Sequence, residues 1–129
     1  MKPRDERGEV SAQFVVLAPA LFMLAFVAVQ ASSLWMAAQT ASIAARRGAR
    51  AASMAIEQGN PFLVAAQSAE TTARELGSRL AAPPLVSVGA SAVAVSVTVR
   101  VGSSGPFVPD HVTRSVTLPL EQFIGEDGR

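Results

Sequence analysis

FVVLAPALFMLAFVAVQASSL, residues 14–34, is the stretch that decides the fold of this chain. Its polar side chains are Gln30, Ser32 and Ser33, and the wider stretch from Val10 to Ala45 contains no Asp, Glu, Lys or Arg. An α-helix rises about 1.5 Å per residue, so about 20 residues cross the roughly 30 Å hydrocarbon layer of a bilayer. Residues 14–34 are therefore predicted to be one transmembrane helix, with the lipid bilayer as its partner.

The helix is expected to continue beyond the membrane as a stalk, because no break signal occurs before Gly59. Trp35 is placed at the membrane interface, where amphipathic rings are favoured. Pro19 lies inside the span, and membrane helices tolerate proline, usually with a kink. At 100° per residue the stalk has a polar face and a face of small residues, which either lets another backbone approach closely or simply reflects the helix propensity of alanine. The polar face holds Gln39, Arg46, Arg50, Ser53 and Glu57, and the small face holds Ala37, Ala41, Ala44, Gly48, Ala51 and Ala55.

The remaining residues, 60–129, are predicted to form a small α+β domain. Asn60-Pro61 has the residue types of a helix start, and we expect Pro83-Pro84 to end that helix. Residues 93–101 and 112–120 alternate between apolar and polar side chains, which predicts two antiparallel strands joined by a loop. Pro119 favours an edge position, and residues 85–88 are a candidate third strand. The apolar stripe of the second helix is expected at Phe62, Ala65, Ala66, Ala69, Ala73, Leu76 and Leu80.

The predicted fold class is α+β: a long N-terminal transmembrane helix, a second short helix and a small antiparallel sheet. Residues 1–8 are a charged leader, and residues 1–9 are expected to be unstructured. Residues 9–59 are the transmembrane helix and stalk, and residues 60–129 are the small domain.

Composition argues against most chemical functions. The net charge is +1, and no basic, aromatic-laced patch indicates nucleic acid. The chain has no cysteine and one histidine, so a zinc site lacks its usual ligands. His111 follows Asp110 in a predicted loop, where such a pair more often belongs to a turn than to a catalytic dyad. Glu70 and Arg74 are spaced as an ordinary surface ion pair. We therefore expect no enzyme activity, no cofactor and no metal.

The N-terminal segments, taken in order, resemble a known family. They are Arg7-Gly8, Gln13-Phe14, Leu17-Ala18-Pro19, the apolar run, and AARRGARAA at residues 44–52. Their order and spacing resemble the TadE-like pseudopilins of the tight-adherence (Tad/Flp) branch of type IV pilus systems, over residues 7–53. This resemblance implies a pilin-like minor pilin or pseudopilin, which is a structural or assembly subunit of a pilus or related secretion machine, without an active site.

The resemblance also implies partners, processing and location. The leader would face the cytoplasm, and a membrane prepilin peptidase would cut between Gly8 and Glu9. The single-pass subunit would carry its C-terminal domain outside the cytoplasm, assembled with other pilin or pseudopilin subunits and the pilus-assembly machinery at the cell surface. The positions implied for helix packing and assembly are Gln13, Phe14, Pro19, Gln30, Arg46, Gly48 and Arg50.

Three positions depart from the family pattern, since Gln13, Gln30 and Arg47 stand where relatives typically carry Glu. A carboxylate at the centre of a bilayer costs on the order of 3 kcal/mol and is usually retained for a partner. Glutamine removes that cost and the charge attraction, but it keeps an interhelical hydrogen bond of about 0.6–2 kcal/mol. The departures favour an accessory subunit that stays in the membrane or assembles differently, unless both glutamines are simply tolerated polar residues.

Charge alone leaves the orientation undecided, because three cationic residues lie before the span and three just after it. The cationic residues are Lys2, Arg4, Arg7, Arg46, Arg47 and Arg50. Orientation therefore rests on the resemblance.

Two alternatives to the pilin-like function stay open. One is a secreted protein whose signal peptide is cut after Ala31, where small residues fit the −3 and −1 positions. The other is an uncleaved single-pass anchor that carries a small binding domain.

Overall fold

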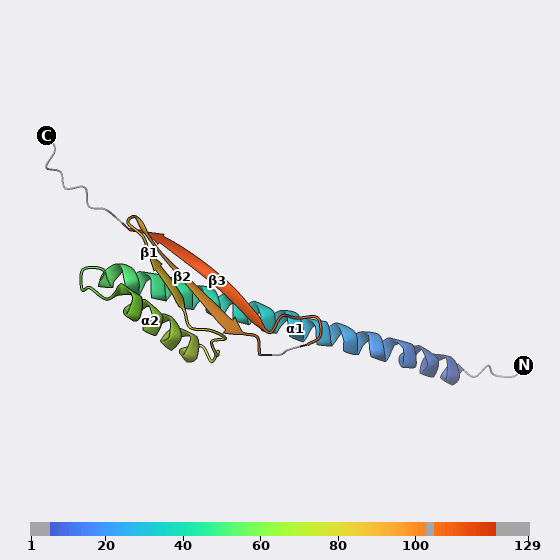
Figure 1. Ribbon diagram of the computed structural model, residues 1–129. Helices are drawn as coiled ribbons and strands as arrows, with labels where there is room; N and C mark the ends of the chain where they lie inside the picture. Colours follow the sequence, from blue (N-terminus) through green and yellow to red (C-terminus); the bar gives the residue numbers. More distant parts are fainter. Residues whose placement is uncertain (1–5, 103–104, 121–129) are drawn as a thin grey trace, which may run out of the picture.

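The computed structural model describes residues 6–102 and 105–120, with side chains described from residue 11 onward. The elements follow the order α1 (Glu6–Ala55), α2 (Pro61–Glu75), β1 (Leu85–Val88), β2 (Ala92–Arg100) and β3 (His111–Pro119). The N-terminal half of α1 projects alone from a small body, which the second half of α1, α2 and the sheet form together (Figure 1). The α+β fold class predicted from the sequence is confirmed.

Helix α1 is longer at its start and shorter at its end than the sequence predicts. It begins at Glu6, so the expectation that residues 1–9 are unstructured is wrong for residues 6–9, while residues 1–5 lie outside the described residues. Pro19 lies inside the helix without dividing it. The helix ends at Ala55, and the chain then reverses through a turn in which Gly59 has a φ of 84°, a conformation that favours glycine.

Helix α2 starts where predicted but ends earlier. Pro61 is its first residue, and proline is favoured there because its missing N–H would have no helical partner. The end at Glu75 is set by Gly77, whose φ is 72°. The N–H of Gly77 donates to the Arg74 carbonyl and that of Ser78 to the Ala73 carbonyl, as in a Schellman motif. The prediction that Pro83-Pro84 ends this helix is therefore wrong.

The sheet is antiparallel with the order β1-β2-β3, so all three predicted strands are present. Central strand β2 pairs with β3 along its whole length, from Ala92 opposite Pro119 to Arg100 opposite His111. Pro119 lies on an edge strand, where the missing N–H breaks no ladder bond. His111 is the first residue of β3 and not the last residue of the loop, which is a small correction to the predicted boundary.

The core is built from alanine and valine between α1, α2 and one face of the sheet. Alternate β2 valines, from Val93 to Val99, are fully buried, and each such side chain contributes about 1.5–3 kcal/mol when removed from water. The predicted apolar stripe of the second helix is wrong at two positions, because Phe62 is 53% exposed and Leu76 is 46% exposed. The buried α1 alanines are Ala37, Ala41, Ala44, Ala45, Ala49, Ala52 and Ala55, and the buried α2 alanines are Ala65, Ala69 and Ala73.

The small face of α1 lets α2 and the sheet approach its backbone. A Cβ added at Gly48 would lie 3.0 Å from the Ala65 carbonyl oxygen, 3.2 Å from the Ala69 Cβ and 3.3 Å from a Val95 methyl. Close backbone approach is thus the reason for this face, and the partner is the same chain. Residues 37–55 therefore lie in the core of the body and are not a stalk that precedes it.

Candidate membrane and assembly surface

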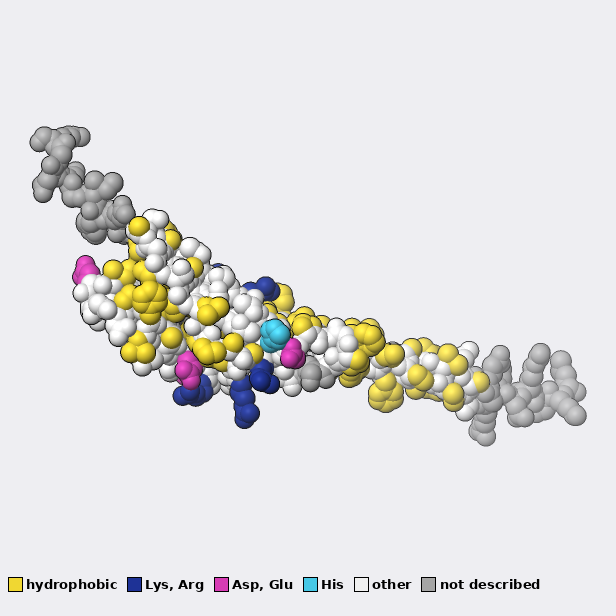
Figure 2. All heavy atoms as spheres, in the orientation of Figure 1, with side chains coloured by type: hydrophobic (Ala, Val, Ile, Leu, Met, Phe, Trp, Pro, Cys, Tyr) yellow, Lys and Arg dark blue, Asp and Glu magenta, His cyan; other side chains and the backbone are white. Residues whose placement is uncertain are grey.

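The projecting half of α1 is exposed and apolar. From Ser11 to Val29 every residue is exposed except Ala18, which is intermediate. The most apolar 18-residue window of the helix has a mean hydropathy of 2.4, and none of it is buried, so α1 is long and apolar enough to cross a membrane. Hydrophobic side chains cover this projection, whereas the described charged side chains lie on the body (Figure 2). The 19 residues from 11 to 29 span about 28 Å, which matches a hydrocarbon layer of about 30 Å.

Packing with the body begins at Gln30, which is 9% exposed. Its amide lies under the loop between β2 and β3, so that a Cβ added at Gly105 would be 3.1 Å from the Gln30 Nε2 atom. Leu34, predicted as the last residue of the span, packs against the protein core instead. The uninterrupted run of exposed residues therefore ends at Val29, five residues before the predicted end of the span.

The structure separates the residues predicted for assembly into distinct places. Gln13, Phe14 and Pro19 are exposed on the projecting half, and Phe14 is 69% exposed. Gln30 lies about 25 Å from Gln13 along the helix, since 17 residues separate them. Gly8 and Glu9 lie within the first turns of α1, so a cut between them requires the helix end to fray locally.

The three predicted positions in the second half of α1 fall on opposite faces. Gly48 is buried in the body, whereas Arg46 and Arg50 are exposed. Arg47, which stands where relatives carry Glu, has its guanidinium 3.4 Å from the Glu75 carboxylate of α2. Both side chains are about 60% exposed, so solvent screening limits this pair to between zero and about 1 kcal/mol. The predicted pair of Arg74 and Glu70 is present at 2.6 Å and is equally superficial.

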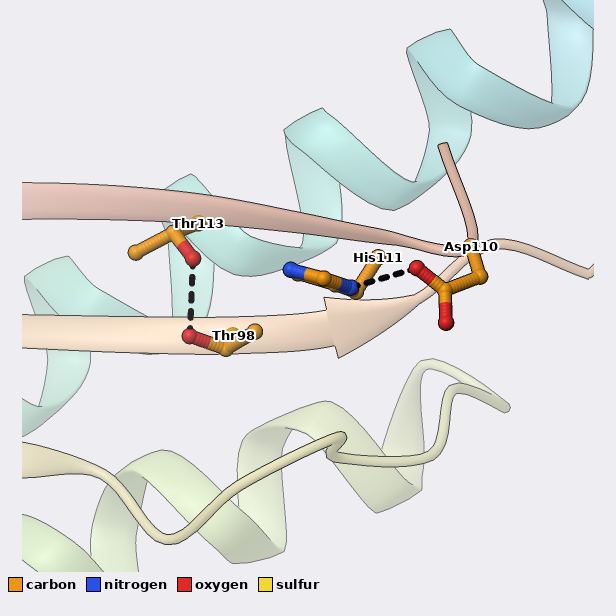
Figure 3. Close-up of polar contacts among 4 residues, drawn as sticks. All are labelled: Thr98, Asp110, His111 and Thr113. Atoms are coloured by element: carbon orange, nitrogen blue, oxygen red, sulfur yellow. Dashed lines mark hydrogen bonds and ion pairs between the residues drawn. The ribbon is translucent and has the colours of Figure 1, made fainter. Parts of the chain in front are cut away.

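His111 and Asp110 form an exposed pair at the start of β3 (Figure 3). The imidazole Nδ1–H donates to the Asp110 Oδ1 at 2.6 Å, and this bond holds the pKa of the Asp110 carboxyl below its ordinary value of 3.8. Beside them the hydroxyls of Thr98 and Thr113 share a 2.8 Å hydrogen bond across β2 and β3. No cluster of three or more His, Cys, Asp or Glu residues that could hold a metal occurs within residues 6–102 and 105–120. The hydrogen bond between His111 and Asp110 therefore orders the start of β3.

A His111→Ala variant tests that interpretation. We expect the pKa of Asp110 to rise toward its ordinary value, because the bond that favours the carboxylate is lost. A depressed carboxyl pKa stabilises the fold at pH values above the unfolded pKa, and the contribution disappears as pH falls through the folded pKa. Carbon-13 NMR titration of the Asp110 carboxyl measures the shift. An unchanged pKa in the variant would mean that His111 does not cause the depression.

The comparison with protein families bears on the same N-terminal surface. A family model described as TadE-like protein matches residues 8–50. The N-terminal third of this chain is TadE-like. The match begins at Gly8 and includes the whole exposed run and the AARRGAR segment, so the resemblance seen in the sequence is confirmed. No curated protein and no solved structure matches the chain.

The family match covers about a third of the chain, residues 8–50. The long apolar N-terminal helix of the chain is consistent with single-pass membrane anchoring. The matched region ends inside the body, because residues 37–50 of α1 form part of the packed core. The TadE-like segment is therefore both the free apolar helix and the helix on which the rest of the chain folds.

Sequence reasoning missed two features near the membrane end of the body. The burial of Gln30 arises from the loop more than 70 residues later in the chain, and no local pattern indicates such a contact. The second is Phe107, which is 93% exposed in that loop. Its signal is visible in the sequence as the apolar run Pro106-Phe107-Val108-Pro109 within an otherwise Gly- and Ser-rich stretch.

Proposed function

We propose that this TadE-like protein is a minor pilin or pseudopilin, a non-catalytic structural or assembly subunit of a Tad/Flp-type pilus or related secretion machine. The observation that carries the proposal is the division of α1. Its TadE-like first half is exposed and apolar, and its second half is the core helix around which a small body folds. A helix of this kind can sit in a bilayer and then pack against similar helices, as a pilus subunit must.

The placement of Gln30 supports retention of the helix over removal as a signal peptide. A cut after Ala31 would remove Gln30 from beneath the loop and would sever α1 one turn before Leu34, which packs against the core. The helix runs through this position without a break. We propose that the helix stays in the cell membrane, with the leader in the cytoplasm, the body outside it, and a prepilin peptidase acting between Gly8 and Glu9.

A helix-swap experiment tests the assembly role in the bacterium that produces the protein. Deletion of the gene is expected to abolish pilus-dependent adherence, and the full-length gene is expected to restore it. The decisive variant replaces residues 11–29 with an unrelated transmembrane helix of the same length, which preserves anchoring and the Gly8-Glu9 cut site but removes the exposed TadE-like surface. We expect this variant to reach the membrane at normal abundance and to fail to restore adherence.

Two outcomes would contradict the proposal. Full restoration by the swapped helix would reduce α1 to an anchor and favour a membrane-tethered binding domain. Normal piliation and adherence in the deletion strain would remove the pilus role altogether. A matched control replaces Phe62, an exposed side chain at the far end of the body, with Ala and is expected to restore adherence fully.

A further inference from the structure

Residues 105–108, in the loop between β2 and β3, lie along α1 at the place where its uninterrupted exposed run ends (Figure 1). Phe107 in this loop is 93% exposed, the highest value among the large hydrophobic residues described. The body therefore leaves a large aromatic side chain uncovered immediately beside the helix. Loop and helix together line one apolar groove, whose lining includes Phe26, Gln30, Leu34, Phe107 and Val108.

The groove is continuous with the surface that faces lipid if α1 spans a bilayer. The exposed run stops at Val29, and Gln30, the next residue, is covered by the loop. With residues 11–29 in the hydrocarbon layer, Phe107 lies at the boundary between acyl chains and headgroups. Aromatic rings are favoured at that depth. Trp35, which is 68% exposed, lies five residues beyond Gln30 on the same helix, which is about one and a half turns.

Cationic residues also lie at this end of the body. The backbone N–H of Arg100 donates to the Arg79 carbonyl at 2.9 Å, which brings the two residues together. Both line a hollow with Ser33 and Met36, about one turn beyond Gln30. Their side chains are exposed, and neither guanidinium takes part in a salt bridge within the described part of the chain. The two arginine charges outnumber the single carboxylate charge of Asp110, so this end of the body carries a net positive charge. A positive charge at this depth attracts lipid phosphates.

We propose that the β2–β3 loop is a membrane-docking element that inserts Phe107 into the bilayer interface and holds the body against the lipid surface. The occupant of the apolar groove is thus phospholipid, with acyl chains against Phe107 and phosphates near Arg79 and Arg100. Apolar faces of interfacial amphipathic helices reach about 5–10 Å into the headgroup and acyl boundary, and an inserted aromatic side chain is expected at a similar depth. This inference requires only that α1 spans a bilayer, so it stands or falls separately from the pilus role.

Tryptophan fluorescence of the full chain in vesicles tests the docking. Trp35 is the single tryptophan, so Trp35→Phe combined with Phe107→Trp makes position 107 the reporter. Both positions are largely exposed, and the substitutions are not expected to disturb folding. In phosphatidylcholine vesicles with bromine near the headgroup end of the acyl chains, we expect a blue-shifted emission and strong quenching. The matched control, Trp35→Phe with Phe62→Trp, is expected to stay unshifted and unquenched.

Three results would overturn the inference. A reporter at position 107 with the emission of water-exposed tryptophan and no bromine quenching would place the loop in solvent. A blue-shifted reporter that brominated lipid does not quench would show that protein, such as a second copy of this chain, covers the groove instead. Quenching of the position 62 control to the same degree would show that the body lies flat on lipid without a specific loop contact.

Discussion

A Val95→Asp variant is expected to lose its folded sheet while the projecting half of α1 stays helical in the membrane. Val95 is fully buried in central strand β2, opposite Val116 of β3 and against Gly48 of α1. An unpaired carboxylate there must either stay charged without solvent or take up a proton, and either event costs several kcal/mol. A small domain is typically stable by about 5–15 kcal/mol, so this cost consumes much or all of the margin.

Hydrogen–deuterium exchange of the protein in micelles measures this effect. Amides of β2 and β3 are expected to lose protection in the variant, while amides between residues 11 and 29 keep theirs. The matched control is Ala94→Asp, one residue away on the opposite face of the same strand and only half-buried. Protection that survives Val95→Asp unchanged would contradict the placement of the core between α1 and the sheet.

A Gly48→Val variant is expected to weaken the same body through crowding. The Cβ alone would lie 3.0 Å from the backbone carbonyl of Ala65, and backbone cannot move aside as a flexible side chain can. Two further methyl groups must then displace α2 or β2, and overpacking of this kind costs typically 1–3 kcal/mol. The gain in helix propensity over glycine, up to about 1 kcal/mol, does not offset that cost.

The comparison that isolates crowding is Arg46→Val, which places the same β-branched side chain on the exposed face of α1. Gly48→Val is expected to raise exchange in α2 and β2 and to lower the thermal midpoint by several degrees, since about 1 kcal/mol shifts a small domain by about 4–8 °C. Arg46→Val is expected to change little. Equal destabilisation by the two variants would mean that a β-branched side chain lowers stability at either face of α1, and that the close approach at Gly48 is not the cause.

The strands, the antiparallel pairing and the start of α2 follow from local patterns. The alternating valines of residues 93–101 identify a half-buried strand, and Pro61 identifies a helix start. The end of α2 could also have been read locally, because Gly77 is the residue type that caps a helix. Pro83-Pro84 gave the stronger break signal but lies after the chain has already left the helix.

Other features depend on tertiary contacts, which periodicity does not contain. The 3–4 spacing of α2 cannot show that Phe62 and Leu76 lie beyond the edge of the surface covered by α1 and the sheet. Hydropathy places Leu34 in the span because it measures composition, whereas the loop at residues 105–108 covers Gln30 and Leu34 packs against the core. The predicted small-residue face of α1 is buried except at Ala51, which is half-buried, and the buried face is wider than predicted because it also contains Ala45, Ala49 and Ala52. Only the fold shows that the partner of this face is α2 and the sheet of the same chain.

The central claim is that the TadE-like helix is kept as the membrane-embedded part of the mature protein. The intact mass of the protein purified from the membranes of its own bacterium tests this claim directly, because it defines the first residue. We predict a membrane-bound chain that begins at Glu9 and contains all of the exposed apolar run. A chain that begins at Met1 would keep the anchor but exclude prepilin-peptidase processing, and a soluble chain that begins at Ser32 would contradict the central claim.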